Sequence, residues 1–419
     1  MNAADDPISA ACDLSAGPAD LTKARGVSRR GFFRAAVGPI ATLSLSRLAL
    51  AARLPGDTSP FLGEQASGLL SSPDTADPTV YPESAIDSTW SYAFGRQTGM
   101  GIVETSLTPV SHGVSLAPGR ASSRTVWDAY ELLEKCHRLG GSGIQTELNG
   151  DLKKLRMRAE QLGMWIEGMV SIPRNSDTAA FEQSLIEAKT AGAIVVRTAL
   201  LGGRRYESFK TLEDWNRWVD QSRGAVRAVI PLLDRHKITL AIENHKDWTL
   251  DEMLRLLKTY ESQYLGCCLD FGNNIALLDD PMEMAVALAP YVRATHVKDM
   301  AVRPYQDGFL LSEVPLGKGL LDLAGMVSTL KRANPMLHLS LEMITRDPLK
   351  VPCMTPQYWT LFPDRSGRYL ARTFKLVQQN SAGDPLPTVS QLPPDDRARV
   401  EEENVKVCLR YALDKHLSA

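Results

Sequence analysis

Between residues 91 and 345, short apolar runs alternate with longer segments whose apolar residues recur every three or four positions. A short apolar run bounded by turn residues predicts a buried strand, and the three-to-four spacing predicts an amphipathic helix. Helices are expected, for example, at 126–139, 178–191, 212–236 and 250–260. Eight strands are expected, at 100–104, 143–148, 164–170, 193–199, 238–243, 265–270, 292–297 and 337–342.

Strands that alternate with helices indicate repeated βα units and a parallel sheet. Eight such units predict an α/β protein of the (β/α)₈ TIM barrel class over residues 91–345. Residues 53–90 are rich in Pro, Ser, Asp and Gly, which indicates a linker or an N-terminal wrap. Residues 346–419 are interpreted as a C-terminal extension that packs on the barrel, ending in a helix near 399–417.

The first 52 residues have the pattern of an export signal. Arg29 and Arg30 precede an apolar, Ala- and Leu-rich stretch that ends in Ala49-Leu50-Ala51. This segment resembles a twin-arginine signal peptide with its cleavage site. The resemblance implies export of the folded protein by the twin-arginine machinery and a periplasmic or secreted location, where an unphosphorylated substrate is expected. The alternative is a basic, Ala-rich tail.

Composition excludes several classes of protein. Lys and Arg total 47 against 49 Asp and Glu, so there is no basic field of the kind that attracts nucleic acid. No apolar run reaches the length of a spanning helix, because Arg34 and Arg47 bracket the one candidate, and no stable membrane insertion is expected. The six cysteines show neither a disulfide framework nor zinc spacing.

Four successive predicted strands end in residues that can bind a metal ion. These residues are Glu243, Asp270, His296 and Glu342. Because the C-terminal ends of parallel barrel strands open on one face, the side chains are expected to converge on one pocket. Three carboxylates and an imidazole suit one divalent ion, with Mn²⁺ favoured and Mg²⁺, Co²⁺ or Zn²⁺ as alternatives.

Each of these residues also has a simpler interpretation when it is taken alone. A single carboxylate at a strand end can be a helix cap or part of a surface ion pair, and a single histidine can be a core residue. Their joint placement favours a metal, because buried carboxylates repel one another unless a cation lies among them.

The strand ends resemble those of the xylose-isomerase-like barrel superfamily, the sugar phosphate isomerase/epimerase group. Residues 315–319 and Asp322 resemble the loop before the last helix in that group. The resemblance implies that Glu243 and Glu342 exchange a proton at a carbon of a small sugar or polyol, through an enediolate. The chemistry agrees, since such an exchange needs a base on each face of the carbon and a Lewis acid at the oxygens.

The chain departs from the ketose 3-epimerases of that group at two substrate-binding positions. Asn273 stands where they carry a histidine, and Val302 stands where they carry an arginine. The strings at 243–245 and 296–299 are closer to the inosose dehydratases, in which a neighbouring Lys or His can protonate a leaving hydroxyl. A dehydratase or lyase of a 3-keto sugar or inosose, acting by β-elimination, is therefore the alternative reaction.

Further residues are candidates for substrate binding. His245 and Lys298 are expected in the pocket; the alternatives are a hydrogen bond behind the ligands for His245 and an ion pair with Asp299 for Lys298. Asn273 is a candidate by its position, and Arg197 at the end of the fourth strand can anchor a carboxylate or phosphate, or be structural.

Two other functions and one assembly stay open at this level. An endonuclease IV-like phosphodiesterase needs more histidines than the seven present, and a metal-bearing binding protein without catalysis is possible on the same scaffold. The aromatic segment with Tyr358, Trp359 and Phe362 can cap the pocket, pack on the barrel or form a homo-oligomer contact.

Overall fold

The computed structural model describes residues 98–107, 128–174 and 177–417. The predicted export signal and the predicted linker at 53–90 lie outside the described residues.

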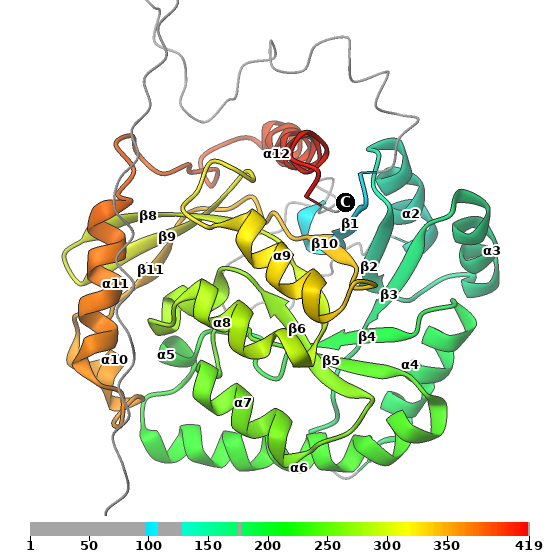
Figure 1. The fold of residues 1–419 in the computed structure, drawn as a ribbon, viewed down its shortest axis with the longest axis horizontal. Helices are drawn as coiled ribbons and strands as arrows, with labels where there is room; N and C mark the ends of the chain where they lie inside the picture. Colours follow the sequence, from blue (N-terminus) through cyan, green and yellow to red (C-terminus); the bar gives the residue numbers. More distant parts are fainter. Residues whose placement is uncertain (1–97, 108–127, 175–176, 418–419) are drawn as a thin grey trace, which may run out of the picture. The chain divides into compact units, whose positions relative to one another are not determined.

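Eight parallel strands form a nearly closed barrel in the order β10-β1-β2-β3-β4-β5-β6-β7 (Figure 1). A parallel bridge between Val297 and Leu341 joins the two ends of this order. The predicted TIM barrel is confirmed. The barrel strands are β1 (Met100–Val103), β2 (Gly143–Glu147), β3 (Trp165–Met169), β4 (Val195–Thr198), β5 (Thr239–Glu243), β6 (Leu265–Asp270), β7 (Val292–His296) and β10 (Leu339–Leu341).

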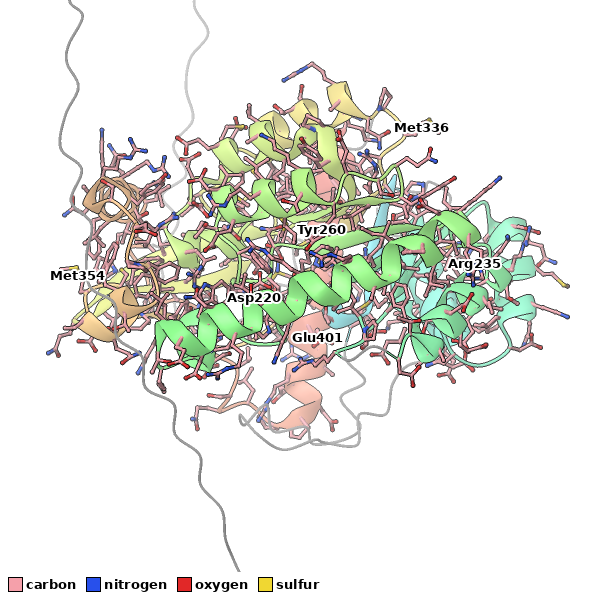
Figure 2. The ribbon with its side chains drawn as sticks, turned by 90° about the horizontal axis from the view of Figure 1, so that it is seen from below. Asp220, Arg235, Tyr260, Met336, Met354 and Glu401 are labelled. Carbon is pink, nitrogen blue, oxygen red and sulfur yellow. The ribbon has the colours of Figure 1, made fainter. Side chains whose placement is uncertain are left out.

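Helices between the strands cover the outside of the barrel (Figure 1). Side-chain caps fix where they begin: Thr249 and Glu252 form a reciprocal capping box at α7, and Asp280 caps α8 with Pro281 in the first turn. The longest, α6, carries Asp220 and Arg235 along its length (Figure 2). These helices are α2 (Ala129–Arg138), α3 (Leu152–Leu162), α4 (Ala179–Thr190), α6 (Leu212–His236), α7 (Leu250–Thr259), α8 (Pro281–Leu288) and α9 (Leu323–Ala333).

A small antiparallel sheet is inserted after β7, where the sequence spacing predicted only a long loop. Strands β8 (Asp299–Tyr305) and β9 (Gly308–Val314) form a hairpin, and β11 (Leu349–Val351) pairs with β9. Residues on both sides of position 345 therefore contribute to one sheet. Beside it lie α10 (Pro356–Thr360) and α11 (Gly367–Gln379), with α5 (Arg205–Ser208) from the β4 side.

The aromatic segment after β11 packs into a second hydrophobic cluster. Tyr358 is buried, and its hydroxyl donates a hydrogen bond to the carbonyl of Ala276 over 2.9 Å. Tyr358 and Phe362 stack with ring centroids 4.8 Å apart. This segment therefore joins the inserted sheet to the loop that follows β6.

The last helix, α12 (Pro394–Asp414), packs on the barrel beside α2. Lys135 of α2 forms an ion pair with Glu402, and the amide of Leu316 donates to the sulfur of Cys408 over 3.4 Å. Leu409 is buried in the same core cluster as the barrel helices. The C-terminal helix thus contributes to the main core.

Within the part of the chain that the structure describes, no helix has the length and apolar character needed to span a membrane.

Candidate metal centre

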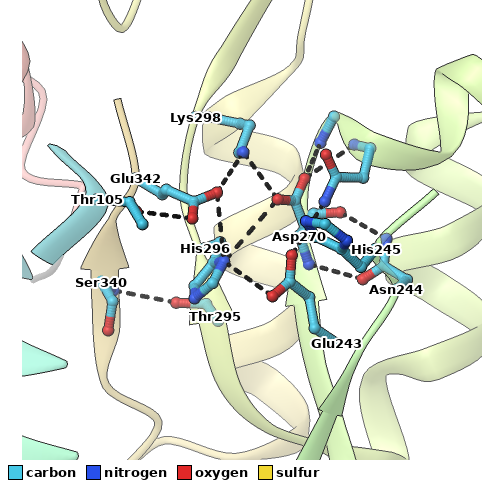
Figure 3. Close-up of polar contacts among 12 residues, drawn as sticks. Thr105, Glu243, Asn244, His245, Asp270, Thr295, His296, Lys298, Ser340 and Glu342 are labelled. Carbon is cyan, nitrogen blue, oxygen red and sulfur yellow. Dashed lines mark hydrogen bonds and ion pairs between the residues drawn. The ribbon is translucent and has the colours of Figure 1, made fainter. Parts of the chain in front are cut away.

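The four predicted ligands meet at the C-terminal ends of neighbouring strands. Glu243, Asp270 and His296 are the last residues of β5, β6 and β7, and Glu342 directly follows β10. One possible ligand atom from each lies within 4.8 Å of the others, and all four residues are buried (Figure 3). The backbone sets this arrangement, because Asp270 pairs with His296 across the sheet and the amide of Glu342 donates to the Val297 carbonyl over 3.0 Å.

The imidazole of His296 occupies the centre of this group. Its Nδ1 lies 3.4 Å from Glu342 Oε2, 3.6 Å from Glu243 Oε2 and 3.9 Å from Asp270 Oδ2. Among the described residues, this buried Nδ1 has no hydrogen-bond partner. A nitrogen that faces three carboxylates without a hydrogen bond is the geometry of a metal ligand.

The opposite nitrogen of His296 is held from inside the barrel. Nε2 of His296 lies 2.6 Å from Gln145 Oε1, and Gln145 Nε2 donates to Glu167 Oε2 over 2.9 Å. Glu167 accepts with its carboxylate, so it orients the Gln145 amide with the oxygen toward His296. His296 then carries its proton on Nε2, which leaves the lone pair of Nδ1 directed at the carboxylates.

Two side-chain cations lie against the carboxylates. Arg197 of β4 forms an ion pair with Glu243, while Lys298 lies between Glu342 and Asp270, with its Nζ 2.8 Å from Asp270 Oδ2 (Figure 3). The expectation that the carboxylates repel one another unless a metal lies among them is therefore only partly met, since the protein supplies part of the positive charge itself.

Burial and these neighbours act in opposite directions on the carboxyl groups. Burial works to raise the pKa of Glu243 and of Glu342, but Arg197 and His296 around the first, and His296 and Lys298 around the second, hold each pKa well below its ordinary value. Burial raises the pKa of Asp270 to about 6, with the other two carboxylates adding to the effect and Lys298 opposing it. Both glutamates are therefore ionised at neutral pH.

His296 is affected by the same charges. Burial alone would lower its pKa, but Cys268, Glu342 and Glu243 outweigh burial and raise the pKa well above its ordinary value. In the absence of a metal, the negative charges of Glu342 and Glu243 thus favour a second proton, on Nδ1 of His296. The same charges would favour a metal ion at that position. Binding of a metal ion at this site would release that proton.

The remaining predicted residues surround the ligands. Asn273 donates from Nδ2 to Glu243 Oε1 over 3.1 Å, and Nδ1 of His245 lies 2.8 Å from the Leu201 carbonyl. Burial lowers the pKa of His245 to about 4, so it is neutral. Direct substrate contacts by Asn273, His245, Lys298 and Arg197 stay predictions.

Lys298 does not form the ion pair with Asp299 that its sequence neighbourhood suggested as an alternative. Asp299 instead accepts backbone N–H groups, including those of Gly317 over 2.9 Å and Leu321 over 3.1 Å. It thereby fixes the loop before α9, the segment that resembles the superfamily loop. Lys298 is free to turn into the ligand group.

Several residues of the site were not predicted from the sequence. Thr105 donates to Glu342 Oε1 over 2.9 Å, and Glu313 of the inserted hairpin lies 3.7 Å from Lys298. Lys246 forms a hydrogen bond with Asn273. Gln145 is one of three successive polar residues in β2, so no signal in the sequence singled it out. All of these residues come together only in three dimensions.

The chemistry of the donor set fits one divalent ion. Three carboxylates and an imidazole offer oxygen and nitrogen ligands without a thiolate, and the unpartnered Nδ1 of His296 is not explained by Arg197 or Lys298. The predicted ligand group is thus assembled, and it could bind a metal whose identity is open.

The chain belongs to the xylose isomerase-like TIM barrel family, whose model matches residues 128–359. A 3-oxo-isoapionate decarboxylase of Pectobacterium atrosepticum is 28% identical over 183 residues, which cover 43% of this chain and 62% of that protein. The uncharacterized protein YihM of Escherichia coli is 31% identical over 65 residues, 16% of this chain and 20% of that protein. The chain thus spans less than two thirds of each of these relatives.

Solved structures of the same fold include an L-ribulose 3-epimerase. It is 15% identical, the match covers 76% of this chain and 96% of that one, and the TM-score is 0.45. A xylose isomerase domain protein from Planctomyces limnophilus is 18% identical, with 59% of this chain and 93% of that one covered and a TM-score of 0.40.

Proposed function

We propose that this protein is an enzyme that binds one divalent metal ion through Glu243, Asp270, His296 and Glu342 and enolises a small sugar or keto sugar. The observation that carries the proposal is Nδ1 of His296, which is buried, lacks a hydrogen bond among the described residues and faces all three carboxylates. Sugar isomerisation or epimerisation is the reaction that two glutamates at one site suit best.

Proton transfer at carbon is the step that the side chains perform. A divalent ion, when bound, would supply positive charge that stabilises the oxygens of an enediolate. One of the two glutamates, as a carboxylate, accepts the proton of the carbon beside the carbonyl. The other first takes up a proton from solvent and then donates it to the opposite face of the same carbon. A proton that is added to the same carbon from the opposite face inverts that carbon, which is epimerisation. A proton that is added to the neighbouring carbon of the enediolate moves the carbonyl, which is isomerisation.

Lys298 favours a second candidate, a lyase that eliminates a β substituent. Its ammonium lies between Asp270 and Glu342, 2.8 Å from Asp270 Oδ2, within the ligand group itself. After a glutamate removes the proton beside the carbonyl, Lys298 donates a proton to the β-hydroxyl, which leaves as water and yields the unsaturated ketone. The 28%-identical relative named as a decarboxylase of a 3-oxo compound supports bond cleavage beside a carbonyl as a chemistry of this family.

The test is proton NMR in D₂O of the Mn²⁺-loaded protein with free ketoses, 3-keto sugars and inososes. Wild type is expected to incorporate deuterium beside the carbonyl, and Glu342→Gln is expected to lose this exchange. The matched control is Glu213→Gln, since Glu213 is exposed on α6. No deuterium in any substrate, together with no bound metal by elemental analysis, would refute the proposal.

Products and one further variant separate the two reactions. A new diastereomer or a shifted carbonyl identifies an epimerase or isomerase, and an unsaturated product identifies a lyase. Under the lyase reading, Lys298→Met keeps the deuterium exchange and loses the unsaturated product. If Lys298→Met forms the unsaturated product at the rate of wild type, Lys298 is not the acid.

A further inference from the structure

Lys246 is a buried lysine in an unusual backbone conformation. It follows β5 in the loop that begins with Asn244, and only 4% of its surface is exposed. Its φ of 62° lies in the left-handed region, which favours glycine and which lysine rarely adopts. Burial of a long charged side chain and a strained backbone are both unfavourable, and they occur here in one residue.

The ammonium of Lys246 has no acidic partner among the described residues. It donates to Oδ1 of Asn273, a neutral amide. The two cations near it do have acidic partners. Lys298 pairs with Asp270 and Glu342, and the guanidinium of Arg346 lies 2.6 Å from Glu313 Oε1. A buried cation without a counterion is unfavourable by itself, which makes it a candidate for binding an anion that arrives from outside.

The charges around Lys246 point in the same direction. The pKa of Lys246 is lowered to about 8, mainly by burial and then by Arg346 and Lys298, while Asp270 and Glu313 oppose the shift. Arg346 and Lys298 thus act on this ammonium more strongly than the carboxylates near it.

Lys246 is connected to the ligand group through one side chain. Asn273 accepts from Lys246 and donates from Nδ2 to Glu243 Oε1 over 3.1 Å, while its backbone amide donates to Asp270 Oδ1 over 2.8 Å. The ammonium is therefore linked through one side chain to Glu243 and Asp270, two of the four residues of the candidate metal centre.

We propose that Lys246 binds a carboxylate of the substrate, so that the enzyme acts on an oxidised sugar, a sugar acid or keto acid, in preference to a neutral sugar. This inference rests on the proposed function for the position of the reacting carbon. It assigns Lys246 the part of a specificity residue, and it leaves the proton transfers to the glutamates and Lys298.

The test compares two probes with the same carbon skeleton, D-erythronate and erythritol, by calorimetry on the full chain with and without Mn²⁺. Wild type is expected to bind erythronate at least tenfold more tightly than erythritol, and Lys246→Met is expected to lose at least tenfold in erythronate affinity with erythritol unchanged. Lys237→Met is the matched control, because Lys237 also has a positive φ, 54°, but is exposed at the end of α6.

A glycine variant keeps the test decisive if the methionine variant folds poorly. Lys246→Gly removes both the left-handed strain and the buried charge, so it is expected to melt at a higher temperature than wild type while losing the preference for erythronate. An unchanged erythronate-to-erythritol ratio in either folded variant overturns the proposal, and so does a lower melting temperature of the glycine variant. Inorganic phosphate that binds wild type more tightly than erythronate also overturns the choice of a carboxylate.

Failure here is distinct from failure of the proposed function. Wild type that binds Mn²⁺ and exchanges deuterium but does not prefer erythronate refutes only the role of Lys246. Wild type that prefers erythronate through Lys246 but neither binds Mn²⁺ nor exchanges deuterium refutes the metal-dependent enolisation and leaves the anion site in place.

Discussion

Nε2 of His296 donates a hydrogen bond to Oε1 of Gln145 over 2.6 Å, although the two residues are 151 positions apart. Gln145 is itself fixed by Glu167 in the barrel interior. This pair determines which nitrogen of His296 faces the carboxylates, and therefore which nitrogen can bind a metal.

Removing this hydrogen bond should weaken metal binding. Gln145→Leu leaves Nε2 of His296 without its acceptor, so the proton can move to Nδ1 and block the ligand atom. We expect Mn²⁺ affinity to fall by roughly 10- to 100-fold, measured by calorimetry. Nitrogen NMR of the metal-free protein, at a pH high enough to remove the second proton that the carboxylates favour on His296, should show wild type as the Nε2–H form and the variant as a mixture.

The control for that change is Gln183→Leu, because Gln183 is exposed on α4. It should leave both the Mn²⁺ affinity and the imidazole nitrogen shifts of His296 unchanged. Equal Mn²⁺ affinities in Gln145→Leu and wild type would show that the barrel interior does not set the tautomer.

Removing Lys298 should have the opposite effect on the metal. Its ammonium neutralises Asp270 and Glu342, so Lys298→Met exposes a divalent ion to more negative charge, and we expect Mn²⁺ to bind about tenfold more tightly. The metal-free variant should lose about 3 to 5 kcal/mol of stability, because buried carboxylates lose their partner. Adding Mn²⁺ should restore much of the loss, which thermal melting with and without EDTA measures.

Lys318→Met is the comparison for this variant, since Lys318 is exposed in the loop before α9. Its melting temperature and Mn²⁺ affinity should match those of wild type. Weaker Mn²⁺ binding in Lys298→Met would mean that the lysine supports the ion instead of competing with it.

Asp247 should make stability depend on pH. Its Oδ1 accepts the amides of Trp248 over 2.8 Å and His245 over 3.1 Å, but Oδ2 is buried without a hydrogen bond among the described residues. Burial raises the pKa of Asp247 from 3.8 to about 7, and the charge of Glu243 adds to the effect. The folded state thus binds this proton more tightly than the unfolded chain does.

The raised pKa therefore stabilises the fold at low pH, and this contribution is lost as the pH rises from about 4 to about 7. Asp247→Asn does not titrate, so between pH 5 and pH 8 it should gain roughly 2 to 3 kcal/mol of stability relative to wild type, by urea unfolding. Asp220→Asn, at an exposed position of α6, should differ from wild type by the same amount at both values. A constant difference for Asp247→Asn as well would contradict the assignment.

The C-terminal helix should be needed for the stability of the barrel. Leu409 of α12 is fully buried in the main core, so Leu409→Ala should lower the free energy of unfolding by about 2 to 5 kcal/mol. Met336→Ala, at a side chain 83% exposed, should change it by less than about 0.5 kcal/mol. Denaturant unfolding followed by circular dichroism measures both, and equal effects would place α12 outside the cooperative core.

The sequence by itself determined the barrel and the residues that can bind a metal. Apolar runs and capped amphipathic segments are local patterns, and they placed strands such as β6 and helices such as α6 within a few residues of their observed bounds. The C-terminal ends of parallel barrel strands lie on the same face. The positions of Glu243, Asp270 and His296 at strand ends therefore predicted that their side chains would lie close together.

Only the tertiary structure decided what surrounds those ligands. The hairpin of β8 and β9 lies where the spacing indicated a loop, Lys298 turns to Asp270 instead of Asp299, and Gln145 reaches His296 across the barrel. Lys246 is buried, and it has no acidic partner within the described part of the chain, although it directly follows the polar residues Asn244 and His245. Each of these depends on distances between residues remote in the chain, and hydrogen bonds, burial and charge act through space, which a linear pattern does not record.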